Sequence, residues 1–600
     1  MTPRPHRPAV SLPTDRRTYL FGPYLLDLGQ RRLLREGKLV PLRPKIFDTL
    51  RALVENHGRL LHKDELMAMV WPDTAVDESN LTHNLSVLRK SLGQNDKARY
   101  IVTLPGRGYR FIAPVEAPLE GSVAVRPFSN LSPDPEQDFF CAGVAEELID
   151  ALASVDGLRV VGRTSSFDRR LRDLSSPEVG EKLRVSAILE GSVRKAGERL
   201  RISAHLIRTS DGTQLWSEHY DRELGDVFEI QEDIARAIVN RVQRKLLAPH
   251  RGFVVPRPTR NQEVYRLYLE ARHHLGTQKG DRLKQAIALL DRALGMQPDF
   301  AHGHALLALC YGVLAVDGFL SVEKAVPKAE EAVERALELN DTIAIAYRAC
   351  GLLRAALQWD WPAAQRAYLR AIRLDPGNPN ARFSYGHYFL APVGRLEEAE
   401  LELRAATDLD PLAPMLGRSL CFIHYLSRNY EQALAEARRT LALDGEYPAT
   451  RALAAACYSA MGRPEDAVRE RQVYMRNAGR PHDADAIGRI FEREGEPGVM
   501  RWSVKQLLKR VDSQDAHYAS LSVLHAWLDE KDPALRWLEE ALKARRGLAM
   551  WVKVHPAFDK LRSEPRYLEL LDGMGVNDPR VATSGTVPLS HGRNDHTRHR

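Results

Sequence analysis

One stretch, residues 76–113, constrains the fold more than any other because it combines a helical pattern with a basic hairpin. Leucines recur every three or four residues at its start, which places them on one face of an α-helix. They are Leu81, Leu85, Leu88 and Leu92. Asp77 or Ser79 can cap this helix, and Gly93 stands where the helix is expected to end. The stretch therefore predicts a helix that packs through a single leucine face.

The opposite face of this helix is polar. It is formed by Ser79, His83, Ser86 and Lys90, with Thr82 and Val87 at its margins. Small polar side chains and one cation on the open side of a helix suit insertion into the major groove of DNA. Strands are expected at 100–104 and 109–112, and their turn displays Arg107, with Arg110 on the returning strand. A polar helix followed by a basic hairpin indicates a winged helix-turn-helix and hence a DNA-binding regulator.

The positive charge of the chain is concentrated in the same region. The 600 residues carry a net charge of +7, and residues 16–114 alone hold 17 Lys and Arg against 10 Asp and Glu. The surplus in this segment equals that of the whole chain, so the remaining residues are balanced. A local excess of cations is what contact with DNA phosphates requires.

The candidate contacts differ in the role that we expect for them. Lys90 and Arg107 would add charge on any DNA sequence, whereas His83 and Ser86 could discriminate between sequences through base edges. The expected DNA-binding residues are Ser79, Thr82, His83, Ser86, Arg89, Lys90, Arg107, Tyr109 and Arg110.

Alternatives stay open for several of these side chains. One alternative is that the polar face is simply the solvated side of a short helix and contacts no DNA. Arg89 and Arg110 can each pair with an acid instead of a phosphate; the acids in question are Asp77, Glu78 and Asp96. Tyr109 and Asn84 are expected mainly to support the structure and to contact the DNA backbone.

The elements before the stretch complete the pattern of one domain. Short strands are expected at 19–27, 32–35 and 38–42, then a helix from Pro44 to Gly58 and another from residue 61 to Val70. Residues 17–114 resemble the OmpR/PhoB-type winged-helix effector domain through LHKDELMAMVW, LRKSLG and VTLPGRGYRF. The resemblance implies that the third helix reads base edges and that the hairpin wing contacts the minor groove or the DNA backbone.

The chain departs from two-component members of that family. Only about sixteen residues precede the domain, so we expect no receiver domain and no switch by aspartate phosphorylation. No transmembrane helix is expected after Pro114, in contrast to the membrane-anchored relatives.

A second unit is expected at 121–247. Its expected strands are 123–127, 158–161, 187–194, 199–207 and 214–218, and its expected helices are 139–154, 177–183 and 227–246. The strings FSNLSPDPEQDFFCAGVAEELIDAL, ILEGSVRKAGERLRISAHLI and LWSEHYDREL resemble the TolB-like N-terminal domain family. That family has no activity that could be assigned to this chain. The resemblance therefore implies only an α/β module that binds a ligand or a partner.

Residues 261–575 are almost entirely helical and repeat with a period near 34 residues. Leu374-Asp375-Pro376 and Leu409-Asp410-Pro411 lie 35 residues apart, and Leu443-Asp444-Gly445 follows 34 residues later. The small residues expected in the helix cores are Ala367, Ala371, Ala405, Ala406, Ala435 and Ala442. This pattern resembles tetratricopeptide (TPR) repeats. Such helix pairs bury their apolar faces by stacking, which leaves a concave surface for a partner.

The remaining features argue against other classes. Five scattered cysteines without a CxxC motif indicate reduced thiols, and we find no signal peptide and no apolar run long enough to span a membrane. We therefore expect a cytoplasmic protein that binds no membrane. Residues 1–16 and 576–600 have the composition of disordered tails. No nucleotide loop, metal-ligand spacing or catalytic constellation occurs, so we expect no cofactor, no metal and no enzyme activity.

The sequence thus predicts a multidomain chain: a winged helix-turn-helix (α+β), a small TolB-like α/β domain, and an all-α TPR solenoid. The predicted function is a transcriptional regulator on double-stranded promoter DNA. Its solenoid would bind a ligand or a protein partner, for which RNA polymerase and a second copy of the chain are the candidates. One alternative is an interaction scaffold whose winged helix contacts protein rather than DNA. Another is an enzyme that acts through the middle unit.

Overall fold

The computed structural model describes residues 18–578 with gaps. The gaps are 22, 29–30, 36–37, 58, 73–75, 94–99, 105–107, 114–120, 133–136, 154, 156–157, 197–198, 224–236, 240–241, 243–258, 260, 277–279, 445–447, 510–516 and 546. The chain forms two compact units, Met1–Glu120 and Gly121–Arg600. The tail predicted at 1–16 lies outside the described residues, as does most of the tail predicted at 576–600.

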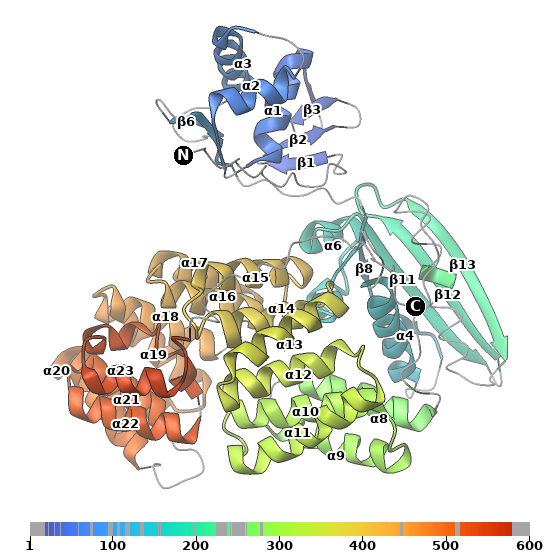
Figure 1. Ribbon diagram of the computed structural model, residues 1–600. Helices are drawn as coiled ribbons and strands as arrows, with labels where there is room; N and C mark the ends of the chain where they lie inside the picture. The colour runs from blue at the N-terminus through green and yellow to red at the C-terminus, as the bar shows by residue number, and fades with distance from the viewer. Residues whose placement is uncertain are drawn as a thin grey trace, which may run out of the picture. The chain divides into compact units, whose positions relative to one another are not determined.

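The described residues of the first unit form two small antiparallel sheets and three helices (Figure 1). The first sheet has the order β1 (Thr18–Phe21), β2 (Tyr24–Asp27), β3 (Arg32–Arg35) and β4 (Lys38–Val40). The helices are α1 (Pro44–Glu55), α2 (Lys63–Val70) and α3 (Glu78–Ser91). The second sheet places β7 (Gly108–Phe111) between β5 (Leu60–Leu61) and β6 (Ile101–Leu104). The predicted order of strands, helices and hairpin is confirmed, although residues 19–27 form two strands rather than one.

The leucine face of α3 forms part of the core of this unit. Leu81, Leu85, Leu88 and Leu92 are each at most 2% exposed. They share one cluster with apolar residues of α1, α2 and both sheets. The helix is therefore anchored through one side, which leaves its other side to solvent.

A single glycine lets the hairpin approach the start of α2. Gly108 has φ +140°, and a Cβ atom at this position would lie 2.0 Å from the carbonyl oxygen of Leu61. Leu61 pairs with Tyr109 across this contact. Only glycine fits here, so the position of the hairpin depends on it.

The α/β part of the second unit is built on a six-stranded mixed sheet. Its strands are β8 (Ser122–Val125), β9 (Ser129–Asn130), β10 (Arg159–Val160), β11 (Ala187–Ala196), β12 (Arg199–Arg208) and β13 (Gln214–Glu223). The order is β10-β8-β11-β12-β13, with β9 beside β11, and β8 pairs in parallel with both β10 and β11. The predicted hairpin is the antiparallel pair of β11 and β12. The assignment of residues 121–247 as a TolB-like domain stays a prediction.

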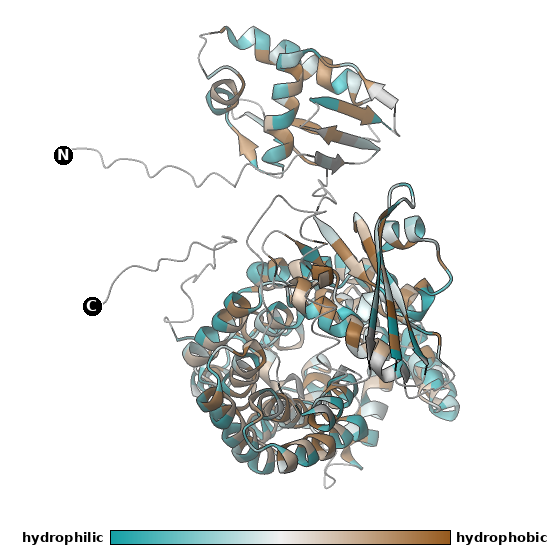
Figure 2. Ribbon diagram, turned by 90° about the vertical axis from the view of Figure 1, so that its right-hand side faces the viewer, coloured by the Kyte–Doolittle hydropathy of each residue, from teal (hydrophilic) through white to brown (hydrophobic). Residues whose placement is uncertain are grey.

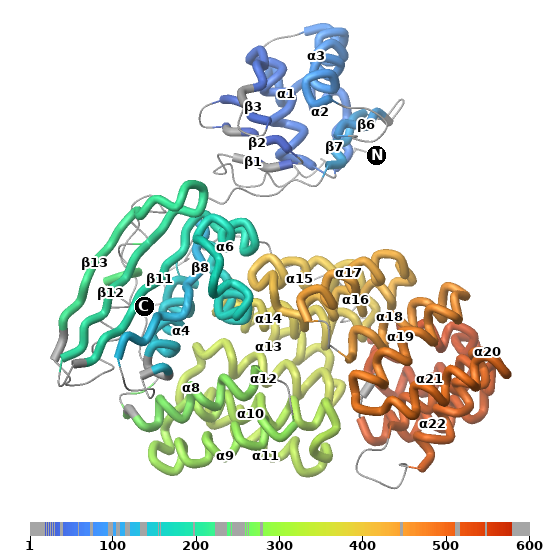
Figure 3. Tube along the Cα trace, turned by 180° about the vertical axis from the view of Figure 1, so that it is seen from behind, coloured from blue at the N-terminus to red at the C-terminus, as the bar shows by residue number. Residues whose placement is uncertain are grey.

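Short helices and one long helix accompany this sheet. They are α4 (Gln137–Ala153), α5 (Arg163–Ser166), the 3-10 turn η1 (Arg169–Leu171) and α6 (Ser176–Leu183). Apolar residues of α4 pack against one face of the sheet in a common core, and Figure 3 shows α4 lying along the strands. Most of the helix predicted at 227–246 lies outside the described residues, but Ile238, Val239 and Val242 belong to this core.

Most of the described residues from Gln262 to Gly573 are helical. The helices are α8 (Gln262–Gly276), α9 (Gly280–Met296), α10 (Ala301–Val316), α11 (Val322–Leu339), α12 (Ala344–Leu352), α13 (Trp361–Leu374), α14 (Pro379–Tyr385), α15 (Leu396–Leu409), α16 (Pro414–Leu426), α17 (Tyr430–Leu443), α18 (Pro448–Ala460), α19 (Pro464–Asn477), α20 (Pro481–Leu508), α21 (Tyr518–Trp527), α22 (Lys531–Ala544) and α23 (Pro565–Gly573). Two π-helices, η2 (Leu353–Gln358) and η3 (Gly386–Leu390), and two 3-10 segments, η4 (Gly547–Trp551) and η5 (Pro556–Leu561), complete the set.

The helices stack in antiparallel pairs as the repeat pattern predicts. Ala367, Ala371 and Ala406 are buried between helices, whereas Ala405 is only half-buried. The expectation for Ala435 and Ala442 is wrong, because both are exposed and the buried positions of α17 include Ala433 and Ala437. With 3.6 residues per turn, positions two residues apart in a helix face different sides. The recurring triplets fix the period but not which face of α17 is buried.

The turns after three successive repeats lie against the α/β part. Gly377 follows α13 and lies close to Ala153, at the end of α4. After α15, the carboxylate of Asp410 accepts hydrogen bonds from the backbone N–H (2.7 Å) and the hydroxyl of Ser165. After α17, the Leu443 carbonyl accepts a hydrogen bond from Arg170. The motif that reveals the period is therefore also the edge on which the α/β part is docked.

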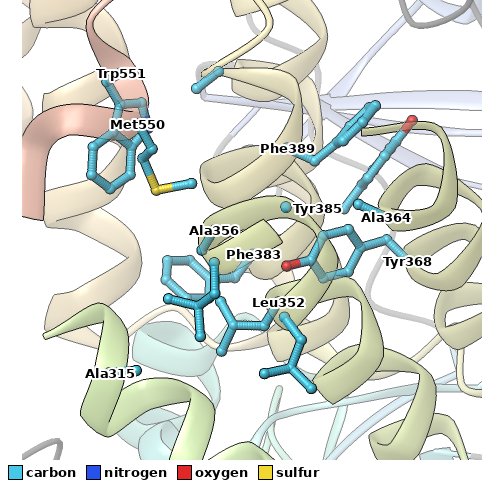
Figure 4. Packing of buried hydrophobic residues seen from close by; sticks show 14 of the residues in the cluster. Ala315, Leu352, Ala356, Ala364, Tyr368, Phe383, Tyr385, Phe389, Met550 and Trp551 are labelled. Carbon is cyan, nitrogen blue, oxygen red and sulfur yellow. The ribbon is translucent and has the colours of Figure 1, made fainter. Parts of the chain in front are cut away.

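The C-terminal segment, residues 547–576, packs against the middle of the helical repeats. The helices carry both hydrophobic and hydrophilic residues, as the colouring of Figure 2 shows. The indole N–H of Trp551 donates to the His387 carbonyl of η3 at 3.0 Å, and that of Trp361 donates to the Met574 carbonyl at 2.7 Å. Figure 4 shows Met550 and Trp551 of this segment facing a group that includes Ala356 and Phe383. The inner side of the central repeats is thus covered by the chain itself.

Candidate nucleic-acid interface

Two polar contacts position α3. The backbone N–H of Ser79 donates to Asp77 Oδ1 at 2.8 Å, so Asp77 is the cap of the helix. This hydrogen bond favours the carboxylate and lowers the pKa of Asp77. On the buried side, the Asn84 amide donates to Thr49 Oγ1 at 3.0 Å and to the Lys45 carbonyl at 3.2 Å. Asn84 is 6% exposed and ties α3 to α1.

The side of α3 that faces away from the core is exposed over three turns. The exposed side chains are Ser79, Thr82, His83, Ser86 and Lys90, all of them predicted site residues. Thr82 donates its hydroxyl hydrogen to the Glu78 carbonyl at 3.2 Å. No described residue forms an ion pair with Lys90. The structure therefore brings these five residues together on one open helix face.

The remaining predicted residues are placed differently. Arg89 is half-buried and donates to Thr103 Oγ1 at 2.6 Å, so it links α3 to β6. Asp96, one of the acids considered above, lies outside the described residues. Tyr109 is 7% exposed and belongs to the core, which leaves little of its side chain for DNA. Arg110 is half-buried. Arg107 lies outside the described residues.

Two residues near α3 are additions to the predicted set. Lys63 Nζ lies 2.7 Å from Glu78 Oε2, and this contact raises the pKa of Lys63. The pair joins the starts of α2 and α3 and offsets the acid at the tip of the exposed helix. Asn80 is exposed beside His83. Helical spacing alone would have identified Asn80, but the ion pair depends on how two helices meet.

The rest of the described chain offers few other chemical sites. In the described ranges, no three His, Cys, Asp or Glu side chains are grouped so that they could hold a metal ion. Nor does any helix there have the length and apolar character to cross a membrane. The five cysteines are free thiols, four of them buried.

The winged-helix geometry agrees with a family match. Residues 37–111 match the model described as transcriptional regulatory protein, C terminal. These residues are an OmpR/PhoB-type DNA-binding domain. Transcriptional activator CadC of Escherichia coli (strain K12) is 35% identical to the chain over 96 residues, which cover 16% of this chain and 19% of CadC. The match to CadC thus has about the length of the winged-helix domain.

Two further relatives extend beyond this domain. Transcriptional regulator HilA of Salmonella typhi is 25% identical over 435 residues, which cover 70% of this chain and 76% of HilA. Putative adenylate cyclase 3 of Rhizobium meliloti (strain 1021) is 37% identical over 196 residues. The chain spans only 33% of that protein's length.

Proposed function

We propose that this protein regulates transcription in the cytoplasm by placing α3 of its OmpR/PhoB-type domain in the major groove of promoter DNA. The observation that carries the proposal is the open face of α3, where five polar or basic side chains are exposed while the leucine face is anchored. A helix fixed on one side and open on the other can present side chains to base edges without losing its own packing.

The residues of the proposed interface would have different roles in binding DNA. Lys90 and Arg107 would neutralise phosphates, and their contribution would be the same on any DNA sequence. His83, Ser86 and Asn80 would face base edges and provide discrimination. Arg89 would act mainly by holding the wing, because its guanidinium is engaged by Thr103.

The second unit would supply regulation. The α/β part is docked on three successive repeat turns, so an event at the helical repeats has a direct physical route to it. A ligand or a protein would bind the repeats, with RNA polymerase and a second copy of the chain as candidate partners. We transfer no cyclase activity from the relative that carries that name, because only a third of its length is shared.

A charge-removal experiment tests the proposed docking. The full chain and the double variant Lys90→Ala/Arg107→Ala are compared on genomic promoter fragments by gel shift at several salt concentrations. If both cations contact phosphates, the double variant binds more weakly and its salt dependence falls by about two released ions. Lys182→Ala, which removes an exposed charge from α6, is the matched control. Unchanged affinity and salt slope in the double variant would contradict the docking.

The size of the helical repeats supports a second candidate, an interaction scaffold whose winged helix contacts protein. Helices α8 to α23 extend from Gln262 to Gly573, which is more than half of the chain. Mapping of chromosomal occupancy in cells separates the two candidates. Enrichment at promoters that disappears in the Lys90→Ala/Arg107→Ala variant supports regulation, and the absence of any enrichment supports the scaffold.

A further inference from the structure

Two Ser-x-His triplets face each other across β12 and β13. Ser203 and His205 lie on β12, and Ser217 and His219 lie on β13. The register pairs Ser203 with His219 and His205 with Ser217, so a local twofold axis relates the triplets. The two histidines are 14 positions apart in the sequence, and the antiparallel pairing of the strands brings them together. Their spacing therefore gave no metal-ligand motif in the sequence.

Both triplets lie on the side of the sheet that is turned away from α4. The alternate residues of the same strands, among them Ile202 and Ala204, are buried in the core that includes α4. Successive side chains of a strand point to opposite sides, so the serines and histidines lie on the other side. His219 is exposed and His205 is half-buried. Both rings are therefore accessible to a ligand from solvent.

Each histidine contacts the serine of the other triplet through Nδ1. Nδ1 of His205 lies 2.9 Å from Ser217 Oγ, and Nδ1 of His219 lies 2.9 Å from Ser203 Oγ. The ring centres are 6.3 Å apart, with an angle of 81° between the ring planes. In the described part of the chain, no residue is hydrogen bonded to Nε2 of either ring. The pair thus has two Nδ1 atoms engaged in the same way and two Nε2 atoms left for a ligand.

This arrangement suits a transition-metal ion. Neutral imidazole is a preferred ligand of Zn²⁺ and Cu²⁺. A histidine that binds a metal through Nε2 donates its Nδ1–H to a nearby oxygen, which fixes the tautomer and the ring orientation, and a serine hydroxyl can accept that hydrogen. With a zinc–nitrogen bond of about 2.0–2.1 Å, each ring centre lies about 3 Å from the ion. Two rings can therefore share one ion at a separation of about 5–6 Å, close to the separation observed.

Two carboxylates near the pair are engaged by arginines. Glu190 of β11 lies opposite His205 and forms an ion pair with Arg126 at 3.3 Å. Asp221 follows His219 by two residues and forms an ion pair with Arg201 at 2.6 Å. We therefore assign only the two imidazoles as protein ligands, and water would fill the other positions of the ion.

We propose that His205 and His219 bind one divalent transition-metal ion of the zinc and copper class through their Nε2 atoms. Ser203 and Ser217 would be positioning residues, because they would accept the Nδ1 hydrogens. The ion would cross-link β12 to β13, which is the last strand of the described sheet (Figure 1). The site lies in the α/β part and does not depend on the proposed DNA binding.

Zinc is the probe for the test. Isothermal titration calorimetry in a buffer that does not bind metals measures the affinity and the number of ions bound. The measurements use the full chain without an affinity tag. Glutamine replaces the three histidines of the C-terminal tail, so that these cannot contribute; they are His591, His596 and His599. One ion per chain is expected, with a dissociation constant on the order of 10 µM, because the pair supplies half the ligands of a structural zinc site.

Variants of the two triplets test both kinds of residue. His205→Gln and His219→Gln are each expected to weaken zinc binding by roughly tenfold or more, because one of two ligands is lost. Ser203→Ala/Ser217→Ala keeps both ligands and is expected to weaken binding about tenfold, because the tautomer is no longer fixed.

Two exposed histidines of the helical repeats provide the matched control. His482→Gln/His517→Gln is expected to leave zinc binding unchanged. Absence of saturable binding before any change to the triplets would overturn the proposal, and so would equal binding by His205→Gln/His219→Gln. Gel shift of the same chains measures DNA binding separately, so failure of the metal site and failure of the proposed function are distinguishable.

Discussion

Two neighbouring polar residues on α3 have opposite roles. Asn84 points into the core, where its amide bonds to Thr49 and to the Lys45 carbonyl. Ser86 is exposed on the face proposed to read DNA. Residues two positions apart on a helix point to different sides, so similar chemistry serves stability in one case and recognition in the other.

Substitution of these two residues separates the roles. Asn84→Ala is expected to lower the free energy of unfolding of the first unit by about 1–3 kcal/mol, because two buried hydrogen bonds are lost. Ser86→Ala is expected to change it by less than about 0.5 kcal/mol. Urea unfolding of residues 1–120 measures both. A large loss for Ser86→Ala, or none for Asn84→Ala, would reverse the assignment of the two faces.

For single residues, the helical periodicity predicted which side chains of α3 are buried or exposed. It did not predict contacts that join two elements. The buried leucines of α3 and its exposed polar residues follow from the spacing alone. The bond from Arg89 to Thr103 could not be predicted, because it requires the position of the hairpin beside the helix. The burial of Tyr109 likewise arises from the pairing of β7 with β5.

Among the elements, the junction between α5 and the turn after α15 is held by several hydrogen bonds. The Ser165 hydroxyl donates to Asp410 and accepts the Leu412 N–H at 2.8 Å. The Gly162 N–H donates to the Leu409 carbonyl at 2.7 Å. Burial raises the pKa of Asp410, and the hydrogen bonds from Ser165 oppose that rise. Removal of the hydroxyl would leave a buried carboxylate less well satisfied.

Ser165→Ala is therefore expected to loosen this junction. The loss is expected to be about 1–3 kcal/mol, because a buried charged acceptor and a buried N–H both lose their partner. Hydrogen exchange followed by mass spectrometry should show faster exchange around 162–166 and 409–412, while the core of β11 and β12 stays protected. Ser217→Ala, at an exposed position of β13, is the control. Unchanged exchange at both sites would mean that the junction is held by its other contacts.

The junction marks a limit of sequence analysis. The triplets at 374, 409 and 443 reveal the period because each ends a helix at the same point of the repeat. Their second role, as the docking edge for the α/β part, depends on residues about 245 positions away, such as Ser165. No local pattern encodes a contact of that separation.

For the molecule as a whole, the C-terminal segment is a structural part of the repeats. Residues such as Val552, Tyr567 and Met574 are almost fully buried in the same cluster as the central helices. Lys553 Nζ donates to the Val393 carbonyl at 3.0 Å, and Arg428 pairs with Asp559. A partner of the helical repeats would meet this segment rather than an empty inner surface.

The packing of the C-terminal segment on the central helices depends on a histidine that must stay neutral. His555 is 4% exposed, and its Nδ1 accepts the Ala557 N–H at 3.2 Å at the start of η5. Burial, assisted by Arg428, lowers the pKa of His555 to about 3. Arg562 acts in the same direction and Asp559 against it.

Acid is therefore expected to destabilise the second unit through His555. The ordinary pKa is 6.5 in the unfolded chain, so the contribution is complete above that pH and is lost as the pH falls toward 3. The loss between pH 6.5 and pH 4.5 should be about 2 kcal/mol. Thermal unfolding across this range measures it. His555→Asn retains a capping acceptor without titrating, so its stability should depend less steeply on pH. Identical pH profiles would contradict this role.

The hydrogen bond between Trp361 and Met574 can form only late in synthesis of the chain. The two residues are 213 positions apart, and a ribosome adds roughly 5–20 residues per second, so about 10–40 s separate their appearance. The winged-helix domain lies within residues 1–120, so it can fold before the rest of the chain is synthesised. A nascent or prematurely terminated chain would thus carry a finished DNA-binding domain ahead of unclosed repeats. Incomplete products of translation would then compete with the full-length protein for the promoter DNA proposed as its target.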